Sequence, residues 1–172
     1  MTGGIGFWHN KNGQALIISF NGGPTATALA NWLAATFPNL YGASAGGNNL
    51  TGNTNAQVAA FYQHLFGLSA PKLDAQVLAT ALNVYATTSS LGGTAGVACG
   101  FVVTAAGLGN SACNVGACGA AFGVPNNATL TVLTLLEEAN AQAVLGVLYN
   151  GNTTLRTQAA TVFAGINSAG GL

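Results

Sequence analysis

The sequence predicts a mainly α fold: a single-domain helical bundle over residues 1–172, with about five to six helices and a small inserted β-hairpin near residues 101–115. Apolar residues recur at helical spacing through most of the chain. One short segment is instead rich in β-branched and aromatic residues. No internal repeat or long linker divides the chain, and a length of 172 residues suits one domain.

Several helices have recognisable ends. Pro24-Thr25 suits the first turn of a helix that carries an apolar face, and Thr54 to Gln57 matches a capping box before the next helix. Two Asn-Gly pairs, at residues 21–22 and 150–151, suit the left-handed backbone of helix ends. Periodicity predicts further helices over residues 73–87, 130–149 and 153–168, and a short helix near 14–20 that could also be a strand.

The inserted hairpin is expected after the third of the long helices. Phe101–Thr104 is β-branched and aromatic, as in a strand. Gly107–Asn110 is typical of a turn, and Cys113–Val115 would form the returning strand.

Charged residues are scarce, and their scarcity excludes several functions. The chain has three Lys and Arg, three Asp and Glu, and 3 % charged residues, whereas about 25 % is usual. Three cations cannot neutralise several phosphates, so we expect no nucleic-acid partner. Every apolar run is broken within a few residues, which predicts no transmembrane segment. A half-apolar chain without net charge is also not expected to be disordered.

Three segments carry a resemblance to a known group of proteins. Gly6–Ile17, which reads GFWHNKNGQALI, resembles the start of a C-terminal helical domain found in large secreted bacterial proteins with β-sandwich repeats. Lys72–Leu82 and Gly151–Arg156 resemble the same domain. The resemblance implies a secreted or cell-surface location, within a longer chain that has an upstream signal. It implies no enzymatic activity.

The chain contains three cysteines, Cys99, Cys113 and Cys118. They allow at most one internal disulfide, with three possible pairings, and they could equally be inert small apolar side chains. The C-x4-C spacing of the last two does not match a common zinc motif. The cysteines depart from the pattern of the resembled domain.

One motif points to a hydrolase. Gly42–Gly46 matches G-x-S-x-G, in which Ser44 would be the nucleophile, His64 the base and Asp74 the orienting carboxylate. Such an enzyme could cleave apolar esters or lactones, for example acyl-homoserine lactones. The motif requires a preceding strand and a following helix, whereas a helix and a Gly/Asn loop are expected here. A surface histidine beside a flexible glycine loop is therefore the favoured interpretation.

Acidic residues offer a second route to catalysis. Glu137 and Glu138 form the only adjacent carboxylate pair, and a partly buried one could act as a general base. Together with Asp74 they are the candidate ligands for calcium, because loops 45–55 and 150–154 supply only neutral oxygen atoms. Polar surface turns without an ion are the alternative.

Trp8, His9 and Asn10 combine an aromatic ring with polar donors, so they could stack on and bind a sugar. The favoured alternative is that Trp8 and Phe7 anchor the N-terminus on the bundle.

Three functional hypotheses follow. A secreted or cell-surface bacterial module for interaction or anchoring is favoured, with a protein partner at the cell surface. A hydrolase of apolar esters or lactones, with calcium as a candidate cofactor, is the alternative. A glycan-binding module that acts through Trp8 is the third.

Overall fold

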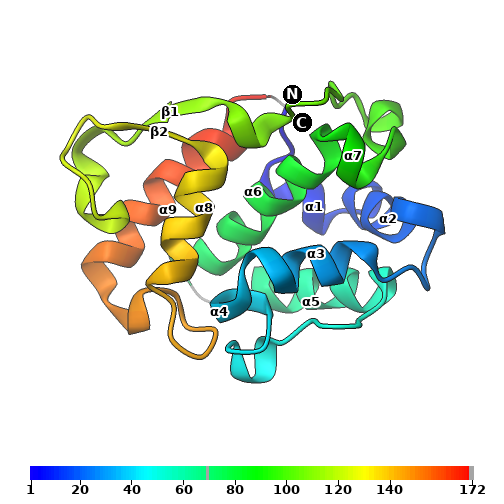
Figure 1. The fold of residues 1–172 in the computed structure, drawn as a ribbon, viewed down its shortest axis with the longest axis horizontal. Helices are drawn as coiled ribbons and strands as arrows, with labels where there is room; N and C mark the ends of the chain where they lie inside the picture. The colour runs from blue at the N-terminus through cyan, green and yellow to red at the C-terminus, as the bar shows by residue number, and fades with distance from the viewer. Residues whose placement is uncertain (69, 171–172) are drawn as a thin grey trace.

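The computed structural model describes residues 1–68 and 70–170, and it confirms a mainly helical fold with a small two-stranded antiparallel sheet (Figure 1). The α-helices are α1 (Ile5–His9), α2 (Lys11–Ser19), α3 (Ala28–Thr36), α4 (Pro38–Tyr41), α5 (Asn55–Gly67), α6 (Leu73–Thr87), α7 (Ser89–Gly92), α8 (Val132–Ala141) and α9 (Thr153–Ser168). The strands are β1 (Ala112–Asn114) and β2 (Thr129–Thr131). Short 3₁₀ helices are η1 (Phe20–Gly22), η2 (Gly46–Asn48), η3 (Ala95–Cys99), η4 (Leu108–Asn110), η5 (Gly116–Phe122) and η6 (Leu148–Gly151).

Helix α6 lies at the centre of the molecule. Every residue from Val77 to Thr87 is buried, so this helix is covered on all sides. It packs against α1, α5, α8 and α9, and Figure 1 shows it running through the middle of the fold. A helix buried all round must also bury its polar side chains, and those side chains require internal partners.

The amide of Asn83 meets this requirement by joining α6 to both ends of the chain. Its Oδ1 accepts hydrogen bonds from the Gly3 amide (2.7 Å) and from Trp8 Nε1 (3.2 Å). Its Nδ2 donates to the Gly3 carbonyl and to Asn167 Oδ1, at 2.9 Å each. Asn83 and Asn167 are 0 % and 2 % exposed. All four bonds that a primary amide can make here are therefore formed away from water.

The two described ends of the chain lie side by side (Figure 1). The hydroxyl of Thr2, which is buried, lies 3.1 Å from the carbonyl oxygens of both Ile166 and Asn167. The first residues and the last helix therefore close over α6 together.

Most of the expected helices are present. The helices α6 and α9 begin and end at the predicted residues, and the predicted capping box at Thr54 and Gln57 is formed. Residues 14–20 lie mostly in α2, so the helical alternative is correct. The helix expected after Pro24-Thr25 begins only at Ala28 and is divided into α3 and α4. Both Asn-Gly pairs have positive φ, at 54° and 111° for residues 21–22 and 48° and 78° for residues 150–151.

The second strand of the predicted hairpin is present, but it pairs with a different segment from the one expected. Strand β1 pairs with β2, with Cys113 opposite Leu130, and Phe101–Thr104 is not a strand. Instead, the Thr104 amide donates to the Thr87 carbonyl at 2.9 Å, and the Leu108 amide donates to the Thr87 hydroxyl at 2.9 Å. The segment after residue 101 therefore supplies donors to the C-terminal end of buried α6. The last carbonyl groups of a helix find no donor within the helix itself, so their partners must come from another segment.

The helix predicted over residues 130–149 is also shorter than expected. It begins at Val132, because Thr129–Thr131 pairs in β2, and it ends at Ala141. Near this end, Asn140 Oδ1 accepts hydrogen bonds from the amides of Asn39 (2.9 Å) and Leu40 (3.2 Å). These bonds fasten α8 to the first turn of α4. The chain reverses direction after α8. Tertiary contacts therefore override the helical pattern.

Among the described residues, no helix combines the length and the apolar character that a membrane crossing requires.

Replacement of Asn83 by alanine is expected to destabilise the fold strongly. The change removes the partner of the Gly3 backbone and of Trp8 Nε1 and leaves these groups buried without that bond, while Asn167 Oδ1 keeps only the Thr80 hydroxyl. The loss costs about 3 kcal/mol of unfolding free energy. Urea denaturation followed by tryptophan fluorescence measures this loss. The matched control is Asn110→Ala, at an exposed asparagine, which should change stability by less than about 0.5 kcal/mol. Equal stability of the two variants would contradict the role given to Asn83.

Candidate functional site

Ser44 does not lie on a nucleophile elbow. It is exposed in the loop between α4 and η2, and its amide donates to the Pro38 carbonyl at 3.1 Å. The element before it is a helix rather than a strand, so the strained turn that activates such a serine is not formed. His64 is exposed in the last turn of α5, as the favoured interpretation expected.

Asp74 is engaged elsewhere. Its Oδ2 accepts from Arg156 Nη2 at 2.9 Å, and the two side chains are 20 % and 19 % exposed. Arg156 also donates through Nη1 to the Leu148 carbonyl at 3.1 Å. Among the residues that the structure describes, no hydrogen bond joins any two of Ser44, His64 and Asp74. The predicted triad is therefore not assembled, and Asp74 instead ties the start of α6 to α9.

The three carboxylates do not form a calcium site. Glu137 is exposed and Glu138 is half-buried on α8. Within residues 1–68 and 70–170, no three His, Cys, Asp or Glu side chains lie close enough to hold a metal ion together. Asp74 on α6 and the glutamates on α8 therefore do not come together in one shared metal site.

A buried tyrosine lies near Asp74, and another lies near Glu138. Burial, and then the negative charge of Asp74, raises the pKa of Tyr41 well above its usual value. Burial, and then the charge of Glu138, raises the pKa of Tyr149. Each carboxylate thus lies near a different buried phenol, and each phenol stays protonated at neutral pH.

Trp8, His9 and Asn10 build the N-terminal corner rather than a sugar site. Trp8 is 0 % exposed, so it cannot stack on a glycan, and its role as an anchor is confirmed. The His9 ring stacks on Phe66 with centroids 3.9 Å apart. Asn10 caps α2 by accepting from the amides of residues 12 and 13.

All three cysteines are free thiols, so of the two alternatives that the sequence left open, the disulfide is not formed. Cys113 and Cys118 lie along one pocket beside α9, and Cys99 lies at the edge of a different and larger pocket. Burial raises the pKa of the Cys113 thiol.

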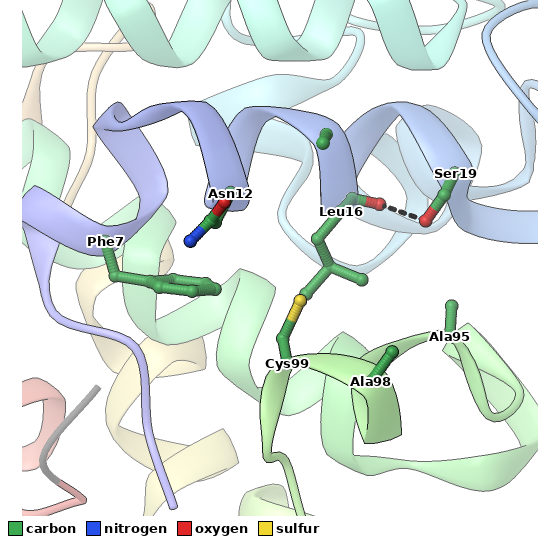
Figure 2. A pocket seen from close by; sticks show the side chains of 8 residues that line it. Phe7, Asn12, Leu16, Ser19, Ala95, Ala98 and Cys99 are labelled. Carbon is green, nitrogen blue, oxygen red and sulfur yellow. Dashed lines mark hydrogen bonds between the residues drawn. The ribbon is translucent and has the colours of Figure 1, made fainter.

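This larger pocket is a groove between α2 and η3 (Figure 2). Its volume is about 620 Å³, within the range of small-ligand sites, and its lining is mainly apolar. We call it the α2–η3 groove. It is lined by Phe7, Asn12, Ala15, Leu16, Ser19, Ala95, Ala98 and Cys99.

Small side chains on both walls, at Ala15 and Ser19 on α2 and at Ala95 and Ala98 on η3, leave space for the groove. On α2 the lining residues stand at positions 12, 15, 16 and 19, which is the i, i+3, i+4, i+7 spacing of one helix face. The facing residues of η3 are Ala95, Ala98 and Cys99. The ring of Phe7 closes one end and packs edge-on against Phe101, with centroids 5.6 Å apart.

Two glycines let each wall lie close against a neighbouring helix. A Cβ on Gly13 would lie 2.2 Å from the Phe7 carbonyl oxygen, so only glycine lets α1 and α2 meet this closely. A Cβ on Gly96 would lie 2.9 Å from the Ala86 carbonyl oxygen, where η3 rests on α6. The core therefore positions both walls.

The polar groups that line the groove are an amide, a hydroxyl and a thiol. The Ser19 hydroxyl donates to the Leu16 carbonyl at 2.8 Å, as the dashed line in Figure 2 shows. The Asn12 amide lies toward the Phe7 end (Figure 2). Among the described residues that line the groove there is no carboxylate, imidazole or amine. A ligand here would meet apolar walls with an amide and a hydroxyl along one side.

Sequence analysis missed the groove. The spacing of Asn12, Ala15, Leu16 and Ser19 is visible in the sequence, but small residues on a helix face indicate close packing as readily as a groove. The opposite wall is η3, which is more than seventy residues away along the chain and has no pattern of its own.

Comparisons with protein-family models, with curated proteins and with solved structures find no match. The functional argument therefore rests on the geometry of this chain.

Ser44 is expected to be unreactive towards a fluorophosphonate probe, because no base contacts its hydroxyl. Gel fluorescence should show no labelling of the wild-type chain above that of Ser44→Ala, with an active serine hydrolase as the positive control. Labelling that disappears in Ser44→Ala would contradict this expectation and revive the hydrolase hypothesis.

Cys113 should be alkylated by iodoacetamide more slowly in the folded than in the unfolded chain. The thiolate is the nucleophile, and a raised pKa lowers the thiolate fraction at pH 8, so the rate should rise only at higher pH. Mass spectrometry of peptides measures the rate at each pH. Without reductant, the unfolded chain should incorporate three labels, and incorporation of one would instead indicate a disulfide.

Proposed function

We propose that this chain is a non-catalytic interaction module of a secreted or cell-surface bacterial protein, and that its α2–η3 groove holds an uncharged apolar group of a partner. The observation that carries the proposal is the groove itself, with about 620 Å³ of space between apolar walls. Apolar walls favour an apolar occupant, since burial removes its surface from water. A charged occupant would lose hydration without gaining an ionic partner.

The proposed location rests on the resemblance of residues 6–17, 72–82 and 151–156 to a domain of secreted bacterial proteins. The composition is consistent with this location, because amides, hydroxyls and glycine replace charges as the source of polarity. Anchoring and interaction are both served by a binding groove.

Only the sequence motif still supports the alternative hypothesis of a hydrolase of apolar esters or lactones. Ser44 and the α2–η3 groove involve different elements, and the groove lining contributes no acid or base. A glycan partner keeps no support from Trp8, because that ring is fully buried.

Titration with an uncharged apolar fluorophore, such as N-phenyl-1-naphthylamine, tests the proposal. Ala15→Glu places a carboxylate in the groove, and binding should weaken at least about tenfold because the carboxylate must lose water. Ala15 is exposed on α2, so the substitution should not disturb the core.

The matched control is Ala35→Glu, at an exposed alanine of α3 that does not line the groove. It should bind the fluorophore as the wild-type chain does. Absence of binding to the wild-type chain, or equal binding by the two variants, would overturn the proposal. Circular dichroism verifies that both variants are folded.

A further inference from the structure

A second pocket lies where α6 and α9 begin. Its volume is about 380 Å³, within the range of small-ligand sites. Asp74 and Arg156 line it, together with Thr153, the first residue of α9. We call it the ion-pair pocket. It involves neither α2 nor η3, so it is a different site from the α2–η3 groove.

The ion-pair pocket concentrates charge in a chain that has very little. Two of the six charged side chains of the whole sequence line it. Among the described residues, the linings of the α2–η3 groove and of the pocket beside Cys113 contain no charged side chain. Asn83 already joins α6 to α9 through Asn167, so joining these two helices does not by itself require an ion pair.

Both charged groups keep the capacity to bind a ligand. Arg156 donates through Nη2 to Asp74 and through Nη1 to the Leu148 carbonyl, and these two bonds orient the guanidinium. A guanidinium carries five N–H groups, so donors remain beyond these two contacts. In the part of the chain that the structure describes, Asp74 Oδ1 has no hydrogen-bond partner. Both side chains are about one-fifth exposed, at 19 % and 20 %, so a ligand can reach them.

The two helices that begin at the pocket differ in the charge of their first turns. The start of a helix favours a negative charge, because its first amide groups have no carbonyl partner within the helix. Asp74 supplies this charge in the first turn of α6. The first turn of α9 has no acidic residue, and Asn152 Oδ1 caps it at the Leu155 amide. A ligand carboxylate beside Thr153 and Arg156 would supply the negative charge that α9 lacks.

A ligand with a single charge fits this pocket poorly. An anion that Arg156 attracts is repelled by Asp74, and a cation meets the reverse arrangement. Lys72 does not line the pocket, and its Nζ instead donates to the carbonyls of Phe66 (2.6 Å) and Leu68 (2.7 Å). A ligand that carries both signs of charge gains from both side chains, so the pocket favours a zwitterion.

The spacing of the two charges matches an α-amino acid. Asp74 Oδ2 and Arg156 Nη2 are 2.9 Å apart. The nitrogen of an α-amino acid lies about 3 Å from its nearer carboxylate oxygen, given standard bond lengths. The ligand can therefore lie antiparallel to the ion pair, with each of its charges against the opposite one. Leu68, Ala70 and Pro71 add an apolar part of the lining, which suits an aliphatic side chain.

We propose that the ion-pair pocket binds a free α-amino acid with a small aliphatic side chain. Asp74 accepts a hydrogen bond from the ligand ammonium, while Arg156 and the start of α9 donate to the ligand carboxylate. Hydrogen bonds between ionised groups are stronger than those between neutral ones, so both ends of the ligand contribute. This site goes beyond the proposed function and does not depend on it.

NMR titration of the isotope-labelled chain with L-valine tests the proposal. The signals of the Thr153 amide and of the Arg156 Nε group should shift, because both groups lie at the pocket. Two analogues separate the charges without any change to the protein. N-acetyl-L-valine lacks the ammonium and L-valinamide lacks the carboxylate, so each should bind at least about tenfold more weakly than valine.

Neutral variants test the two side chains. Asp74→Asn and Arg156→Gln should each weaken valine binding at least about tenfold. The matched controls are Glu137→Gln and Lys11→Gln, which remove exposed charges outside the pocket and should bind valine as the wild-type chain does. Ala15→Glu, in the α2–η3 groove, should also leave valine binding unchanged. Circular dichroism verifies that each variant is folded.

Absence of valine-dependent shifts at tens of millimolar valine would overturn the proposal. Equal binding of N-acetyl-L-valine would reduce the pocket to an anion site, and equal binding of L-valinamide would reduce it to a cation site; either result overturns the proposal. Valine binding that Ala15→Glu abolishes would place the ligand in the α2–η3 groove and overturn it as well. If Asp74→Asn or Arg156→Gln does not fold, the analogue series on the wild-type chain decides.

Discussion

The hydrogen bonds of one buried amide, Asn83, place the N-terminal segment and the last helix on α6, and the site depends on that placement. The amide fixes Trp8, Trp8 fixes α1, and the close approach at Gly13 then fixes α2 against α1. Because α2 is one wall of the groove, its position follows from bonds formed some distance away in the core. The other wall, η3, rests on α6 at Gly96. A change at α6 would therefore alter the positions of both walls of the groove.

Side-chain amides make helix caps and links between elements that charged side chains often make in other proteins. Asn10 and Asn152 cap helices, Asn140 fastens α8 to α4, and Asn55 donates to the Phe20 carbonyl at 2.6 Å. An amide offers donors and an acceptor at once and carries no net charge, so its burial costs less than burial of an ion. Amides also do not titrate near neutral pH, which leaves Asp74–Arg156 as an ionic link between elements that otherwise meet through amides and apolar packing.

Local signals predicted the long helices, and tertiary bonds decided what those signals could not. The ends of α6 and α9 follow from apolar periodicity and, for α9, from a capping asparagine. The partner of β1 is a three-residue segment, and a pairing that short leaves little pattern in the sequence. The end of α8 depends on Asn140 reaching the first turn of α4, a contact between residues about a hundred positions apart. The groove is a space between two elements, so no residue pattern encodes it directly. The G-x-S-x-G match misled because the strand that must precede the serine of a nucleophile elbow is not formed.

The α2–η3 groove and the backbone turn over residues 144–147 each depart from the choice of residues that would maximise stability. Larger side chains at Ala15 and Ala98 would fill the groove and bury more apolar area. Asparagine or glycine at position 145 would relieve a left-handed leucine, whose strain is about 1–2 kcal/mol, and would remove an exposed apolar side chain. At the capping box of α5 and the buried amides of α6, in contrast, the local choices agree with the fold. Selection removes only changes that bring stability below the level that function requires, so such departures can persist, and a strained position among them is grounds for a hypothesis of function rather than proof of one.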